Sequence, residues 1–135
     1  MSFDVFVQDL PPDARTVADI PGDFAPRPIG RRSDIVAGIL RVAPYADFAD
    51  PTWGQIVGPG FSIEVNMGPD EVLDSFAFHV RGGQEALLIV ADILRELRLR
   101  AIVPGTESGF FELSELAPAY VRWQAHRQRM VGGGT

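Results

Sequence analysis

The chain has 135 residues, of which 46% are hydrophobic and 22% charged, as expected for one ordinary globular domain. It contains neither cysteine nor lysine, which excludes thiol nucleophiles, thiolate metal sites, Schiff-base catalysis and a Walker-type phosphate loop. The formal net charge is −6, and the first 80 residues hold 12 acidic side chains against 5 arginines. Because a phosphate backbone would be repelled by this charge, we expect no nucleic-acid partner.

The remaining composition limits location and cofactors. His79 and His126 are the only histidines, so a histidine-rich metal site is excluded and we expect no metal and no cofactor. The first residues have no cationic segment followed by an uninterrupted apolar run, and no stretch approaches the roughly 20 apolar residues of a membrane span. We therefore expect a cytoplasmic protein that does not contact a membrane.

The first third of the chain predicts a strand, an irregular connection and a helix. Phe3, Val5 and Val7 alternate with their neighbours at a period of two, which indicates a strand. Residues 10–30 contain five prolines and predict an irregular connection. Residues 31–43 place apolar side chains at helical spacing and end before a proline, so we expect the first helix there.

The middle of the chain predicts a hairpin followed by a second helix. Residues 45–60 are rich in Pro, Gly and Asp and predict a loop. Strands are expected at 61–67 and 72–80, joined by a turn at 68–71, and a helix at 84–99. This helix is apolar beyond one stripe, so we expect either another element or a second subunit on its flank.

The last part predicts one more strand and a terminal helix. The strand is expected at 100–103, at 110–113, or at both, and the helix at 114–131. The order β-α-β-β-α-β predicts a single α+β domain over residues 1–131, a two-layer ferredoxin-like sandwich with an added C-terminal helix and a disordered tail at 132–135. The alternative is another two-layer α+β sheet with an extra strand.

One face of the predicted sheet carries the candidate ligand-binding residues. With the turn at 68–71, Ile63 faces Phe76 beneath the helices. The opposite face then presents the polar candidates, to which the preceding loop could add an aromatic platform: Glu64, Asn66, His79, Arg81 and Trp53.

The same register argues against catalysis by a Glu64–His79 pair. Glu64 is expected opposite Ser75, four residues from His79, which at ~3.4 Å per residue corresponds to about 14 Å. The first and third strands are expected to be parallel neighbours, so Gln8 rather than Asp4 is expected near His79 and no carboxylate is predicted to orient its imidazole. Proton transfer needs hydrogen-bond reach, and we therefore predict no catalytic residue.

Arg81, Gly82 and Gly83 form a candidate anion-binding junction. Glycines permit close approach, and a helix N-terminus offers free N–H groups to an anion. The alternative, which we favour, is that the glycines serve a tight turn and Arg81 pairs with a nearby acid.

Several segments together resemble a group of small bacterial proteins of unknown function. The resemblance covers roughly residues 50–113 and depends on DPTWG, GFSIEVN, FHVRGG before an apolar helix, and a short Gly-Phe-Phe strand. The matching residues are Trp53, Gly54, Glu64, Asn66, His79, Arg81, Gly82, Gly83, Gly109 and Phe111. The resemblance implies a shared fold and no particular activity.

Three functions are considered from the sequence. We favour a non-enzymatic binding or interaction protein that forms a homodimer, because of the apolar second helix and the absence of a catalytic set. The second is a small enzyme or ligand-binding domain that uses the polar sheet face, which a pocket joining three of the four polar candidates would favour. The third is an immunity or regulatory partner that neutralises a basic protein through the acidic first half.

Overall fold

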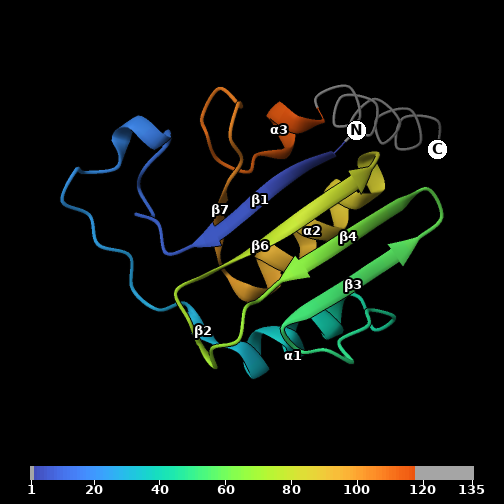
Figure 1. Ribbon diagram of the computed structural model, residues 1–135. Coiled ribbons are helices and arrows are strands. Elements are labelled where there is room, and N and C mark those ends of the chain that lie inside the picture. Colours follow the sequence, from blue (N-terminus) through green and yellow to red (C-terminus); the bar gives the residue numbers. More distant parts are fainter. Residues whose placement is uncertain (1, 118–135) are drawn as a thin grey trace, which may run out of the picture.

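The computed structural model describes residues 2–117, which form a five-stranded antiparallel sheet with two helices on one side (Figure 1). The strands of the sheet are β1 (Ser2–Gln8), β3 (Trp53–Gly58), β4 (Phe61–Asn66), β6 (Ser75–Gly82) and β7 (Arg100–Ile102). The helices are α1 (Arg32–Val42), α2 (Gln84–Leu97) and the single turn α3 (Leu113–Leu116), with a short 3₁₀ turn at Val17–Asp19. A separate two-stranded ribbon joins β2 (Gly30–Arg31) to β5 (Val72–Leu73).

The predicted α+β class with two layers is confirmed. The order is β3-β4-β6-β1-β7, and β1 runs antiparallel to β6. This pairing corrects the expectation that the first and third predicted strands are parallel. Strand β3 is added at the edge beside β4, and without it the order is that of the second, third, first and fourth predicted strands. Of the predicted terminal segments, residues 118–131 and the tail at 132–135 lie outside the described residues.

Strand β3 lies in a segment whose composition predicted only a loop. Its glycines serve packing, because a Cβ at Gly54 would strike the ring of Phe48. Ile56, which lies between Gly54 and Gly58, is fully buried and contributes an apolar side chain to the core. On the outer edge, the backbone of Asp47 exchanges hydrogen bonds of 2.8 and 2.9 Å with Gln55. The strand is thus stabilised by side-chain packing and by pairing with residues nearby in the chain, which its loop-like composition did not indicate.

The predicted tight turn at 68–71 is wrong, because residues 67–74 make a longer excursion between β4 and β6. There β5 pairs with β2 instead of continuing the hairpin. The Arg32 guanidinium holds the excursion by donating Nη1 hydrogen bonds to the carbonyls of Gly68 and Pro69, at 3.1 and 2.8 Å. As a result Glu64 pairs with His79 and not with Ser75, a slip of four residues.

An even slip in register leaves every side chain on its predicted face. Ile63 and Phe76 are both buried under the helices, as expected, although they are not cross-strand partners. The strand at residues 2–8 and the helices near 31–43 and 84–99 also lie close to their predicted bounds. The periodicity of the sequence therefore predicted the two faces of the sheet, and only the partners changed.

The apolar flank of α2 is covered by α1. Ala86 and Ile93, which widen the apolar face of the helix, are fully buried. The two helices approach closely where a Cβ at Gly38 would strike Leu97. The predicted covering of the flank by another element is thus confirmed for this part of the helix, whereas Ile89 on the same flank is only half-buried. None of the helices in residues 2–117 is long and apolar enough to cross a membrane.

The segment before α1 and the last strand share a second, smaller core. Leu10, Ala14 and Phe110 are buried together there. Arg100 fixes the irregular connection by donating hydrogen bonds to the carbonyls of Pro11 and Ala14, at 2.6 and 2.8 Å. Its guanidinium also lies 4.2 Å from the centre of the Phe110 ring. Of the two candidate segments for the last strand, 100–102 is the strand, and 110 joins its edge by a single bridge.

Candidate functional site

The side of the sheet that α1 and α2 leave uncovered, here called the open face, carries a polar row across four strands. Asp4 of β1 pairs with His79 of β6, His79 pairs with Glu64 of β4, and Glu64 pairs with Gln55 of β3. The row formed by these four residues is called the His79 row. It corrects two predictions: Asp4, not Gln8, is the neighbour of His79, and Glu64 lies directly opposite His79 rather than about 14 Å away.

Asp4 orients the imidazole of His79. The Asp4 Oδ1 and His79 Nδ1 atoms are 2.7 Å apart, a charge-assisted hydrogen-bond distance. In the neutral imidazole this contact assigns the proton to Nδ1, which donates it to the carboxylate, and leaves Nε2 as an acceptor. The side chain of His79 is 33% exposed, so its Nε2 can be reached by a ligand or by water. The expectation that no carboxylate orients His79 is therefore wrong.

Trp53 covers one side of the imidazole. The ring centres of Trp53 and His79 are 5.8 Å apart, with 25° between the planes, which is an offset stack. Trp53 pairs with Asn66 in the row next to the His79 row, on the side of Ala77. Arg81 lies in the row on the other side. The stack therefore leaves the side of His79 that faces Arg81 uncovered.

A shallow hollow of about 170 Å³ lies on that uncovered side and is called the His79 hollow. Three of the predicted ligand-binding residues line it, namely Glu64, His79 and Arg81. Asp4 and the flanking residues Phe3 and Val80 complete the lining. Within residues 2–117, neither Glu64 nor Arg81 makes an ion pair, although both face this small space. The hollow thus presents both signs of charge, with an oriented imidazole between them.

Asn66 lies outside the His79 hollow. It lines a neighbouring hollow of about 490 Å³ on the same face, together with Phe6 and Ala77. Phe6 is 39% exposed, which makes this second hollow more apolar than the first. The predicted polar face is therefore divided, and only part of it collects charged groups.

The backbone explains the two glycines of the candidate anion site. Gly82 has φ of +119°, and a Cβ there would lie 2.7 Å from the carbonyl oxygen of Gly60. Gly83 is the N-cap of α2, and a Cβ added to it would meet no heavy atom within 4 Å. Gly82 thus serves the close turn from β6 to α2, as the favoured alternative predicted. Arg81 does not pair with a nearby acid among the described residues, so that part of the alternative is wrong.

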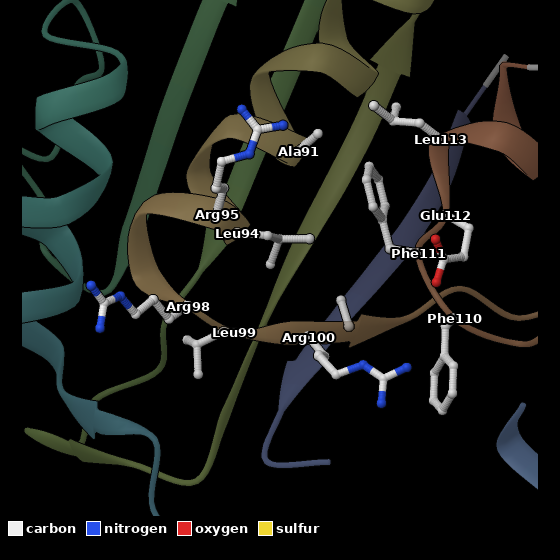
Figure 2. A pocket seen from close by; sticks show the side chains of 11 residues that line it. Ala91, Leu94, Arg95, Arg98, Leu99, Arg100, Phe110, Phe111, Glu112 and Leu113 are labelled. Atoms are coloured by element: carbon white, nitrogen blue, oxygen red, sulfur yellow. The ribbon is translucent and has the colours of Figure 1, made fainter. Parts of the chain in front are cut away.

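A larger groove of about 530 Å³ lies on the helical side, between α2 and residues 110–113 (Figure 2). Arg95, Arg98 and Arg100 surround it, but Figure 2 shows their guanidinium groups pointing in different directions. Arg100 is held by backbone carbonyls, and Arg95 contacts Asp92 at 3.4 Å. These arginines therefore do not converge on an anion, and the groove lacks the charged convergence found beside His79.

Residues 2–117 contain no group of three side chains with the composition and spacing of a metal site. The carboxylates of the His79 row are consequently interpreted as hydrogen-bonding groups.

Sequence patterns missed Asp4 and Gln55 as members of the site. Asp4 could have been found as the polar member at the centre of the first alternating strand, but its partner depends on strand order. Gln55 was missed because the strand that carries it was predicted to be a loop. Comparison with family models, curated proteins and solved structures finds no match for this chain.

Proposed function

We propose that this chain binds a small polar molecule in the His79 hollow. The observation that carries the proposal is the meeting of Glu64, His79 and Arg81 in one hollow, with Asp4 holding the imidazole. Charged side chains without partners are costly to leave unpaired when a binding event desolvates them, so a ligand that pairs with them is selected over one that does not. A few convergent polar groups in a concavity are typical of small-molecule sites.

Acid–base chemistry on the bound molecule is a natural extension of this site. Asp4 favours the His79 tautomer whose Nε2 accepts a proton, which is the state required of a general base. A His–Asp pair needs a reacting group within hydrogen-bond reach, and the hollow is the place where that group would lie.

A ligand screen followed by nuclear magnetic resonance tests the proposal. We expect some members of a chemically diverse fragment set to shift the backbone amide signals of Asp4, Glu64 and Arg81 together. The variant Glu64→Gln should weaken those shifts, whereas Glu85→Gln, on the exposed side of α2, should leave them unchanged. Fragments that bind only elsewhere, or none at all, would contradict the proposal.

A second candidate function is association of two copies through an apolar groove. The groove has a volume of about 660 Å³ and is lined mostly by apolar residues of β3, β4, α2 and the loops beside them: Tyr45, Val57, Gly58, Pro59, Phe61, Glu85, Leu88 and Ile89. Tyr45 and Val57 are 57% and 60% exposed. Burial of such side chains between two copies would favour a homodimer.

Light scattering after size exclusion tests this second candidate. We expect a dimer at high micromolar concentration that the variant Val57→Asp converts to a monomer, because a buried charge without a partner is unfavourable. Gln55→Asp, on the same strand and face but outside the apolar groove, is the matched control. A wild-type monomer at that concentration would refute the homodimer and leave ligand binding unaffected.

A further inference from the structure

We infer that the ligand of the His79 hollow is a zwitterion whose ammonium and carboxylate groups are bonded to the same carbon atom, as in an α-amino acid. The inference rests on the proposed function and names the chemical class that the hollow would select. It is carried by the arrangement of Asp4, Glu64 and Arg81 around the open side of His79.

The charges of the hollow are separated by sign. Asp4 and Glu64 lie on either side of His79 in the His79 row, so two carboxylates flank the imidazole. Arg81 lies in the next row, paired with Ser2 and Ser62, and its cation faces the same hollow. A ligand that places an ammonium group at the row and a carboxylate toward Arg81 matches both signs at once.

A ligand with only one charge is disfavoured at this site. A lone cation would pair with the carboxylates of Asp4 and Glu64 but would be desolvated beside Arg81, a like charge. A lone anion would meet Arg81 and be desolvated beside the two carboxylates. Like charges at short range are the ordinary means by which a site rejects the wrong partner.

The register also sets the distance between the two charges of the ligand. Arg81 is a diagonal neighbour of both Asp4 and Glu64, which corresponds to about 7–8 Å between positions on the sheet. Side chains in strands stand roughly perpendicular to the sheet, so for extended side chains a similar spacing separates the charged groups. Charge-assisted hydrogen bonds at the two ends take up about 2.8 Å each. Roughly 2 Å is left between the ligand's charged groups, as in an α-amino acid and not in a long-chain amino acid.

The volume of the hollow agrees with a head group of this size. About 170 Å³ corresponds to between five and six water molecules at ~30 Å³ each. The ammonium nitrogen, α-carbon and carboxylate of an amino acid are five non-hydrogen atoms. The hollow is therefore large enough for the head group alone, and the side chain of the ligand would extend above the open face.

A titration with matched ligands tests the inference. Each of the twenty standard L-amino acids is added singly while the amide signals of Asp4, Glu64 and Arg81 are followed. For the strongest binder, the methyl ester, which lacks the carboxylate, and the N-acetyl derivative, which lacks the ammonium, are then titrated. Because one hydrogen bond to a charged group contributes about 1.5–3 kcal/mol, we expect each derivative to bind at least tenfold more weakly than its parent.

Two variants assign the charged groups to their partners. Arg81→Gln should weaken binding of the parent amino acid about tenfold or more. It should leave binding of the methyl ester unchanged, since the ester has already lost the carboxylate that Arg81 contacts. Glu64→Gln should weaken binding of the parent amino acid but leave binding of the N-acetyl derivative nearly unchanged. Arg95→Gln, on the exposed surface of α2, is the control for loss of a positive charge elsewhere.

The outcomes separate the inference from the proposed function. If a derivative with a single charge binds as tightly as its parent, the ligand is not a zwitterion and the inference is overturned. If no amino acid binds while other fragments bind in the His79 hollow, the inference is again overturned and the proposed function stands. If no compound of any class binds in the hollow, both are overturned.

Discussion

Substitution of the two adjacent glycines at the end of β6 separates backbone requirement from ligand binding. Gly82 has φ of +119°, and an added Cβ would lie 2.7 Å from the carbonyl oxygen of Gly60 and 2.8 Å from the Cα of Phe61. Neither obstacle is the flexible end of a side chain. Gly83 has φ of −102° and open space at its Cβ position. Gly82→Ala is therefore expected to lower the stability of the fold strongly, and Gly83→Ala to leave it nearly unchanged.

The magnitude for Gly82→Ala has two parts. Holding alanine in a backbone region that favours glycine costs about 1–3 kcal/mol. Pressing its methyl group against fixed backbone adds the overpacking penalty of about 1–3 kcal/mol. For Gly83→Ala, the poorer N-cap and the reduced entropy of the unfolded chain oppose each other and leave a net change within about 0.5 kcal/mol. At about 4 °C per kcal/mol for a domain of this size, the Tm should fall by roughly 8–24 °C in the first variant and by at most about 2 °C in the second.

Thermal unfolding followed by circular dichroism measures both variants under the same conditions. The account predicts a large drop for Gly82→Ala beside an almost unchanged Gly83→Ala. Equal Tm values for Gly82→Ala and the wild type would show that β6 does not turn into α2 at Gly82 with the described backbone. The whole explanation of the glycine pair would then fail.

Three further predictions concern the core, the ribbon and the aromatic stack. Ile63 is fully buried, so Ile63→Ala should lower the free energy of unfolding by about 2–5 kcal/mol and Ile63→Val by only about 0.5–1.5 in urea titrations, and equal effects would place it outside the core. A hydrogen bond from the Ser33 hydroxyl, together with the nearby arginines, holds the pKa of Glu71 below its usual value. The ionised carboxylate therefore stabilises the fold fully at pH values above the usual pKa, and this stabilisation is lost as the pH falls through the lowered pKa. Glu71→Gln should therefore flatten the loss of stability between about pH 5 and pH 3, and an unchanged slope would contradict the contact. Trp53→Leu should move the ring-proton signals of His79 downfield by removing the shielding of the stacked indole, and unshifted signals would refute the stack.

The faces of the sheet could be predicted because they depend on local alternation. Ile63, Phe76 and Phe78 are apolar at a period of two, and any even shift in pairing leaves them buried. Glu64 and His79 were placed on the open face for the same reason. Such patterns need no knowledge of which strands meet.

The partners could not be predicted because they depend on distant contacts. The register of His79 is set by the excursion at 67–74, which Arg32 holds through backbone carbonyls and which β2 extends by pairing with β5. The position of Asp4 depends on β1 lying antiparallel to β6. Neither contact leaves a mark in the local pattern of β4 or β6. The charged hollow depends on these two long-range contacts. A register inferred from the sequence alone misses both, and therefore does not bring the charged residues together.

Cross-strand nuclear Overhauser effects in the protein without ligand test the central claim most directly. The claim is that Asp4, His79 and Glu64 share one row, which places Arg81 beside them in the hollow. The account predicts backbone contacts from His79 to Asp4 on one side and to Glu64 on the other. Contacts that instead join Glu64 to Ser75 and place Gln8 beside His79 would disperse the charges and contradict it.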